Sequence, residues 1–185
     1  TPAGEAASYG LHESQSRLWE NMVGRSLPFC RWLKSTSGMA FSADERRFWR
    51  SINAVTPSLI RVDADEVTYN LHVCLRFGIE RDLIEGTLDP KDVPSAWNAG
   101  MRDLLGVDVP DDARGALQDV HWSGGAFGYF PSYAIGNLYA AQLYAAAKEA
   151  VPGLEDGYAR GEFAPLLAWL RGNGHRHGSL MSADD

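Results

Sequence analysis

The hydrophobic and polar positions of this chain repeat at the spacing of α-helices. Over residues 11–23, the apolar side chains of Leu11, Leu18 and Met22 fall at helical intervals, and Gly24 follows them as a helix-ending residue. The pattern predicts an amphipathic helix over this stretch.

A second pattern predicts a much longer helix from Thr56 to about Glu85. Thr56 is a good capping residue, Pro57 suits the first helical position, and Gly86 follows the last periodic residue. Side chains with polar groups recur one turn apart on this predicted helix and would face either water or a cleft. They are Arg61, Asp65, Tyr69, His72 and Arg76.

Three further helices are expected, over residues 92–105, 131–150 and 162–171. The segment 115–128 between them is rich in glycine and aromatic residues. Because no stretch shows the alternating pattern of a strand, the sequence predicts an all-α fold.

Composition narrows the classes of function. A chain of 185 residues with 45% hydrophobic and 22% charged residues can form a folded domain. Its net charge of −7 argues against general nucleic-acid binding. No apolar run reaches the roughly 18 residues of a membrane span, and no secretory signal is visible, so we expect a cytoplasmic protein. Cys30 and Cys74 lie far apart, and we expect both to be buried structural thiols.

The string His12–Asn21 places His, Glu, Gln and Arg on the first turns of the predicted helix. By spacing alone, a His-Glu pair there is more often a solvated first turn than a metal site. The sequence also contains no HExxH motif, which commonly supplies two histidine ligands and the general base of a zinc hydrolase.

Four strings nevertheless resemble, in order, motifs of the carboxypeptidase Taq family of zinc-dependent metallocarboxypeptidases. HESQSRLWEN at 12–21 resembles the string that follows HExxH in that family. IRVDAD at 60–65 matches its IRxxAD motif, GALQDVHW at 115–122 matches GxxQDxHW, and FGYFPSY at 127–133 continues the likeness. The resemblance covers almost the whole chain and implies a long-helix, gluzincin-like zinc peptidase architecture, of which residues 1–185 would be the C-terminal part of a single catalytic domain.

The resemblance also implies roles for particular residues. Glu13 would be the third ligand of a zinc ion, with cobalt as an alternative metal, and the other two ligands would come from an N-terminal portion that this chain lacks. His12 and Gln15 would lie near the substrate. A carboxylate ligand that leaves one coordination position open for water suits metal-assisted hydrolysis.

Substrate recognition and catalysis are assigned on the same basis. Arg61 would bind the free carboxylate of a peptide, because a guanidinium can hold both oxygens, with Asp65 one turn away holding it in place. An exposed Arg-Asp pair is the alternative without the motif. His121 and Tyr133, with Tyr129 second, would donate hydrogen bonds to the developing oxyanion, and Asp119 would orient His121.

Two hypotheses follow. In the first, the complete protein releases single C-terminal amino acids from peptides, while this chain alone is inactive because it lacks two ligands and the general base. In the second, the chain is an inactive helical module that binds peptides or dimerises. The family likeness also suggests a homodimer. His175 and His177 are expected in an exposed turn after the last helix.

Overall fold

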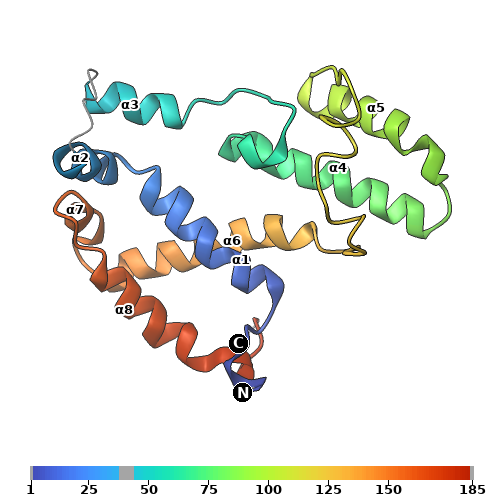
Figure 1. The fold of residues 1–185 in the computed structure, drawn as a ribbon. Coiled ribbons are helices and arrows are strands. Elements are labelled where there is room, and N and C mark those ends of the chain that lie inside the picture. The colour runs from blue at the N-terminus through green and yellow to red at the C-terminus, as the bar shows by residue number, and fades with distance from the viewer. Residues whose placement is uncertain (1, 38–43, 184–185) are drawn as a thin grey trace. The chain divides into compact units, whose positions relative to one another are not determined.

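The computed structural model describes residues 2–37 and 44–183, and every regular element within them is a helix (Figure 1). The chain divides into two compact units. The first unit comprises residues 1–53 and 135–185, and the second comprises residues 54–134. The all-α prediction is therefore confirmed for the described residues, whereas their membership of a single catalytic domain stays a prediction.

The first unit begins with a short 3-10 helix, Pro2–Gly4. α1 (Tyr9–Arg17) follows and continues directly into a π-helical segment, Leu18–Gly24. The side chain of Ser8 caps α1 by accepting a hydrogen bond from the backbone N–H of Leu11 at 3.1 Å. The predicted helix over 11–23 is confirmed, but its second half has the wider π-helical turn. π-Helical turns are rare in proteins, and those that occur are often found near functional sites.

Helices α2 (Leu27–Thr36) and α3 (Glu45–Ile52) follow in the first unit, and the hydrophobic pattern did not predict either one. α6 (Pro131–Ala150) has the predicted bounds, and its first residues, 131–134, belong to the second unit. α7 (Leu154–Tyr158) and α8 (Ala164–Asn173) complete the set, with α8 close to its predicted range.

The core of the first unit is apolar apart from two tyrosines. It brings together residues from the π-helical segment, α6, α7 and α8. Its members are Leu18, Val23, Ala140, Tyr144, Ala147, Leu154, Tyr158, Leu166 and Leu170.

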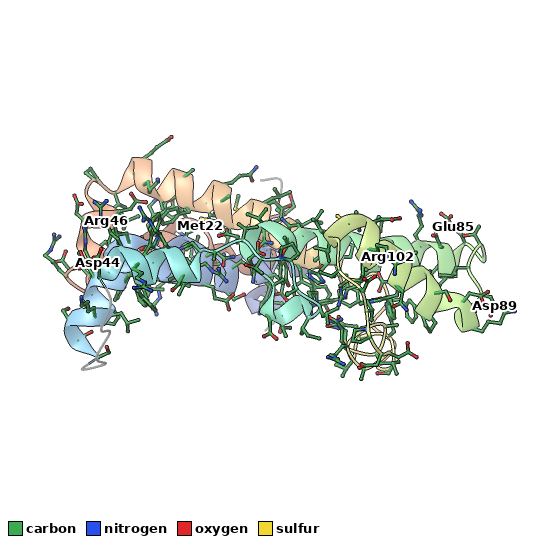
Figure 2. All side chains as sticks on the ribbon, turned by 90° about the horizontal axis from the view of Figure 1, so that it is seen from above. Met22, Asp44, Arg46, Glu85, Asp89 and Arg102 are labelled. Carbon is green, nitrogen blue, oxygen red and sulfur yellow. The ribbon has the colours of Figure 1, made fainter. Side chains whose placement is uncertain are left out.

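The second unit is built on α4 (Glu66–Ile84) and α5 (Val93–Leu105), which pack side by side. Trp97 and Met101 of α5 are buried against Leu75 and Ile79 of α4. Charged side chains such as Glu85 and Arg102 are exposed on this unit (Figure 2). The predicted helix over 92–105 is confirmed, and Gly106, whose positive φ of 68° suits a glycine, caps its end at Leu105.

The predicted start of the long helix was wrong. α4 begins at Glu66, and Asp65 is its capping residue, accepting hydrogen bonds from the backbone N–H groups of Val67 and Thr68 at 2.9 Å each. The backbone N–H of Thr56 also donates to the Asp65 carboxylate, at 3.0 Å. Thr56 therefore folds back onto this cap instead of starting a helix itself.

Two expectations about exposure were also wrong. The stripe of polar side chains does not face water or a cleft, because Tyr69, His72 and Arg76 are buried within the second unit. Cys30 is buried as expected, but Cys74 is exposed on α4. Among the described residues, no helix is long and apolar enough to cross a membrane.

Candidate active site

Glu13 lies on α1 and is positioned by close packing against α6. A Cβ atom placed on Gly136 of α6 would lie 2.8 Å from Cβ of Glu13 and 3.2 Å from the backbone N of Ser14. One residue further along α6, Asn137 accepts a hydrogen bond from Nε of Arg17 at 2.6 Å. The backbone of Glu13 is thus held directly against a glycine.

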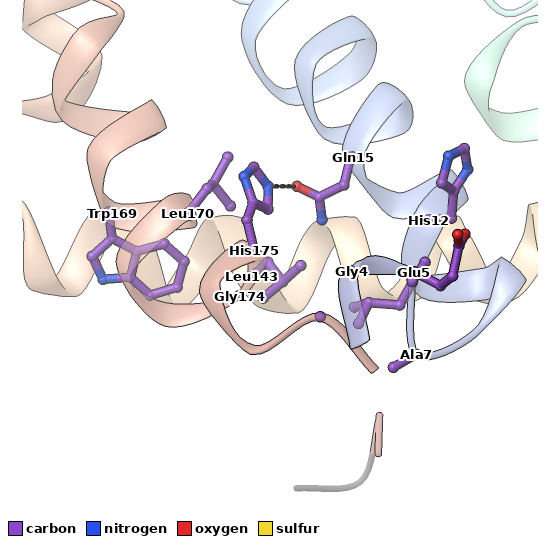
Figure 3. A pocket seen from close by; sticks show the side chains of 13 residues that line it. Gly4, Glu5, Ala7, His12, Gln15, Leu143, Trp169, Leu170, Gly174 and His175 are labelled. Atoms are coloured by element: carbon purple, nitrogen blue, oxygen red, sulfur yellow. Dashed lines mark hydrogen bonds between the residues drawn. The ribbon is translucent and has the colours of Figure 1, made fainter. Parts of the chain in front are cut away.

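His12 and Gln15, on the same helix, line a pocket of about 260 Å³ within the first unit (Figure 3). Its other walls include the apolar side chains of Leu11, Leu143 and Trp169. The 3-10 helix His175–Leu180 follows α8 where an exposed turn was predicted; His175 is exposed as expected, and His177 is half-buried. Nε2 of His175 is 2.8 Å from Oε1 of Gln15.

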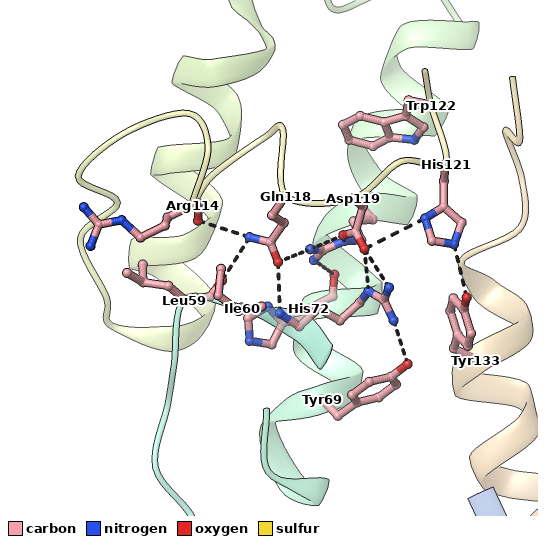
Figure 4. Close-up of polar contacts among 12 residues, drawn as sticks. Leu59, Ile60, Tyr69, His72, Arg114, Gln118, Asp119, His121, Trp122 and Tyr133 are labelled. Carbon is pink, nitrogen blue, oxygen red and sulfur yellow. Dashed lines mark hydrogen bonds and ion pairs between the residues drawn. The ribbon is translucent and has the colours of Figure 1, made fainter. Parts of the chain in front are cut away.

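The second unit holds a buried network centred on Asp119 (Figure 4). One carboxylate oxygen, Oδ1, accepts a hydrogen bond from Nη2 of Arg61 at 2.6 Å, and the other, Oδ2, accepts one from Nε of Arg76 at 2.6 Å. The side chains of Arg61, Arg76 and Asp119 are only 6%, 0% and 12% exposed. A single carboxylate therefore lies between two guanidinium groups in a nearly dry setting.

Gln118, the neighbour of Asp119, ties this network to the backbone. Its Oε1 accepts hydrogen bonds from the backbone N–H of Arg61 at 2.9 Å and from Nη2 of Arg76 at 2.7 Å. Its Nε2 donates to the carbonyl oxygens of Leu59 and Arg114. The IRxxAD and GxxQDxHW strings, far apart in sequence, are joined by these contacts.

Burial and the charges of the network both shift the pKa values of its members. Burial alone would raise the pKa of Asp119, but the hydrogen bond from Arg61 and the charges of Arg76 and Arg61 outweigh it and lower that pKa. Burial lowers the pKa of Arg76 to about 10, although Asp119 opposes this change. All three groups are charged at neutral pH.

His121 and Tyr133 meet at the edge of this network. Nε2 of His121 is 3.1 Å from the Tyr133 hydroxyl, and the His121 ring lies with its centroid 5.7 Å from that of Tyr129. Nδ1 of His121 is 3.9 Å from Oδ1 of Asp119 and has no hydrogen-bond partner among the described residues. Burial is the main reason why the pKa of His121 is lowered, so its ring is neutral near pH 7.

Comparison with known proteins identifies the family. Residues 1–185 match the model of the carboxypeptidase Taq (M32) metallopeptidases. The chain belongs to the M32 family. It is 51% identical over 183 residues to thermostable carboxypeptidase 1 of Thermus thermophilus, covering 97% of this chain and 36% of that protein. It is 44% identical over 185 residues to carboxypeptidase 1 of Bacillus subtilis, covering 96% of this chain and 36% of that protein.

Solved structures agree with this assignment to the M32 family. The M32 carboxypeptidase from Deinococcus radiodurans R1 matches with a TM-score of 0.92 and 48% identity, covering 99% of this chain and 38% of that one. Metallocarboxypeptidase 1 of Trypanosoma cruzi matches with a TM-score of 0.91 and 39% identity, covering 99% of this chain and 39% of that one. The chain thus spans little more than a third of the length of these M32 relatives.

M32 proteins are metallopeptidases, and the ligands available in this chain can be examined directly. Among the described residues, no group of three or more His, Cys, Asp or Glu side chains could hold a metal ion. Glu13 carries one carboxylate, whereas a catalytic zinc site commonly uses three protein ligands. The described part of this M32 chain therefore does not form a metal site by itself.

The structure brings five of the predicted M32 site residues together and gives Asp65 a role other than the predicted one. Arg61, Asp119, His121, Tyr129 and Tyr133 form one cluster in the second unit. The prediction that Asp65 holds Arg61 was wrong, because Asp65 caps α4, and Arg61 bonds to Asp119 and to the Tyr69 hydroxyl.

Carboxylate binding by Arg61 stays a prediction, and the burial of its side chain and its three bonds within the network speak against it. The sequence pattern assigns Arg76 only to the polar stripe of the long predicted helix. Its buried place beside Asp119 could not be predicted from that pattern, because a charged residue in a helical pattern usually indicates an exposed position.

Proposed function

We propose that this chain is part of a metallocarboxypeptidase that releases single amino acids from the C-termini of peptides. In this proposal zinc is the metal, with cobalt as an alternative, and peptides are the substrates. Membership of the M32 family supports the reaction class. The observation that carries the proposal is the pairing of His121 with Tyr133, because it places a histidine and a hydroxyl donor from two family motifs at one point.

The Tyr133 hydroxyl would donate a hydrogen bond to the carbonyl oxygen of the bond that is cleaved, and His121 would hold that hydroxyl in place. We assign the ring proton of His121 to Nδ1, which faces the Asp119 carboxylate, so that Nε2 accepts the hydrogen bond from the Tyr133 hydroxyl. A substrate oxygen that gains negative charge becomes a stronger acceptor and takes over this hydroxyl. Tyr129 lies beside both rings and would help to shape the site.

Glu13 would be one metal ligand, and the two remaining ligands would come from residues outside this chain. A metal in such a site makes a bound water acidic enough to attack a peptide carbonyl. The position of Glu13 on the close contact between α1 and α6 supports this role, because a ligand needs a fixed backbone. His12 and Gln15, which line the pocket beside it, would contact the substrate. A homodimer stays a prediction.

The central test measures amino-acid release by the protein that contains this chain. With a dipeptide that is blocked at its N-terminus as substrate, we expect metal-dependent turnover. Tyr133→Phe should reduce kcat roughly 10²–10³-fold. Tyr9→Phe is the matched control, because Tyr9 is 69% exposed and lies outside the cluster. Absence of turnover in the folded, metal-loaded protein would favour the inactive helical module.

The role of Glu13 is tested separately by metal content. Glu13→Gln keeps the size of the side chain and removes its charge, so the purified protein should retain much less metal. Glu149→Gln, an exposed change on α6, serves as the control and should leave the metal content unaltered. Equal metal content in both variants would remove Glu13 from the proposal.

A further inference from the structure

Arg61, Arg76 and Asp119 have a geometry that suits a role in positioning other side chains. We propose that these three residues form a platform that fixes the tautomer of His121 and the position of the Tyr133 ring. The inference rests on the proposed function, in which the Tyr133 hydroxyl would touch substrate and His121 would hold that hydroxyl. It assigns to both arginines a role other than binding a substrate carboxylate.

Arg76 anchors the platform from the middle of α4. Its side chain is fully buried, and each of its three nitrogens donates a hydrogen bond: Nε to Asp119, Nη2 to Gln118 and Nη1 to the carbonyl oxygen of His72. A lysine could not reach all three acceptors in this way, because its N–H groups all leave a single nitrogen. Arg76 therefore sets where the Asp119 carboxylate lies.

Arg61 holds the opposite side of Asp119 and contacts Tyr133. Its Nε and Nη2 both donate to Oδ1 of Asp119, at 3.2 and 2.6 Å, and its Nη1 donates to the Tyr69 hydroxyl at 2.9 Å. The guanidinium carbon lies 4.7 Å from the centroid of the Tyr133 ring, within the range of a cation–π contact. A peptide carboxylate would have to displace Asp119 to reach Arg61.

Asp119, fixed on both sides, presents its carboxylate to His121. Oδ1 is 3.9 Å from Nδ1, too long for a hydrogen bond but close enough for a strong electrostatic preference in a buried setting. The other charged groups near His121 are Arg61, Arg76 and Glu80. The negative charge closest to Nδ1 favours a proton on that nitrogen, which leaves Nε2 to accept from Tyr133.

The test uses nitrogen NMR of the histidine rings in the ¹⁵N-labelled protein, with His121→Gln to assign the signals. In the unchanged protein we expect the proton on Nδ1 of His121. In Asp119→Asn the ratio of the Nδ1–H to the Nε2–H tautomer should fall at least about tenfold, because the charge that favours Nδ1–H is gone. Asp111→Asn, which alters an exposed pair with Arg114, should leave the ratio unchanged.

The pKa of His121 in the same spectra separates a local effect from unfolding. Loss of the Asp119 charge should lower this pKa further, whereas unfolding would return it toward about 6.5. Arg61→Lys keeps the charge but replaces three separate donor nitrogens with one, so it would hold Asp119 less firmly and should shift the tautomer ratio in the same direction by a smaller factor.

An unchanged tautomer ratio in a folded Asp119→Asn protein would overturn the inference. If that variant does not fold, an unchanged ratio in Arg61→Lys would overturn it equally. The proposed peptidase function fails in a different way, by an absence of turnover in the unchanged protein whatever the tautomer of His121. The two failures are therefore distinguishable.

Discussion

The two units of the chain hold their candidate residues by different physical means. In the first unit, Glu13 lies on a helix that is placed by steric contact, with Gly136 allowing the close approach. In the second unit, His121 and Tyr133 border a network of buried charges around Asp119. The first arrangement depends on shape, and the second depends on charge.

The buried polar side chains among the described residues show the same difference between the two units. Among them, the acids, arginines and histidine all lie in the second unit, whereas the buried polar residues of the first unit are the uncharged Ser14 and Asn21. These buried acids, arginines and histidine are Arg61, Asp65, His72, Arg76 and Glu80. The second unit should therefore respond to lost charges and to pH, and the first unit should respond to changes of volume.

The largest effect is expected from Asp119→Ala. This change leaves the guanidinium groups of Arg61 and Arg76 buried without their carboxylate, and breaking a buried ion pair costs about 3–5 kcal/mol of the free energy of unfolding. Urea denaturation measures the loss. Asp111→Ala, which breaks the exposed pair with Arg114, is the control and should change stability little. Similar losses in both variants would contradict the description of the second unit as charge-dependent.

A smaller loss of stability is expected at acidic pH, and it arises from His72. Its ring is fully buried, neither ring nitrogen has a hydrogen-bond partner among the described residues, and burial followed by the charges of Arg76 and Arg61 lowers its pKa from 6.5 to about 4. Between these two pH values the unfolded chain binds a proton that the folded chain does not. The free energy of unfolding should therefore fall by up to roughly 3 kcal/mol as the pH drops from 6.5 to 4.

Replacing His72 isolates this contribution. His72→Gln should flatten the decline of stability between pH 6.5 and 4, and His175→Gln, at an exposed position, should leave it in place. Below pH 4 the lowered pKa values of Asp119 and Asp65 predict a further decline in both variants, because those carboxylates then become protonated. A decline that is equally steep in His72→Gln would show that another group causes it.

Much of the helical fold could be predicted because local signals agreed with the final structure. α5 has Pro94 in its first turn and Gly106 directly after its last residue, and α6 combines a starting proline with a run of strong helix formers. The start of α4 could not be placed, because Thr56 and Pro57 carry a good local signal that Asp65 overrides from nine positions away. α2 was missed although its signal was present, since Ser26 caps it and a proline follows.

The candidate site was predictable as a set of residues but not as an arrangement. The motifs identified His121 and Tyr133, which the structure brings within 3.1 Å. They did not show that Arg61 is buried, because that depends on Asp119, which is 58 positions away. Ion pairs between residues far apart in the sequence leave no periodic pattern along the chain. The role of Arg76 could therefore be recognised only in the structure.

The smallest effect, Gly136→Ala, tests the first unit by volume alone. The added Cβ would lie 2.8 Å from Cβ of Glu13 and 3.2 Å from the backbone N of Ser14, so α1 must shift, at a cost of about 1–3 kcal/mol. Gly78→Ala on α4 is the matched control, because no atom beyond the neighbouring helix backbone lies within 4 Å of the new Cβ there, and the better helix former should add about 0.5–1 kcal/mol.

Opposite signs for these two glycine changes in urea denaturation would support the steric account, and equal signs would contradict it. If Glu13 is a metal ligand, Gly136→Ala should also weaken metal retention, because the shift moves the backbone that carries the carboxylate. Loss of stability without loss of metal would separate the two properties. The packing of α1 on α6 would then support the fold of the first unit but not its proposed chemistry.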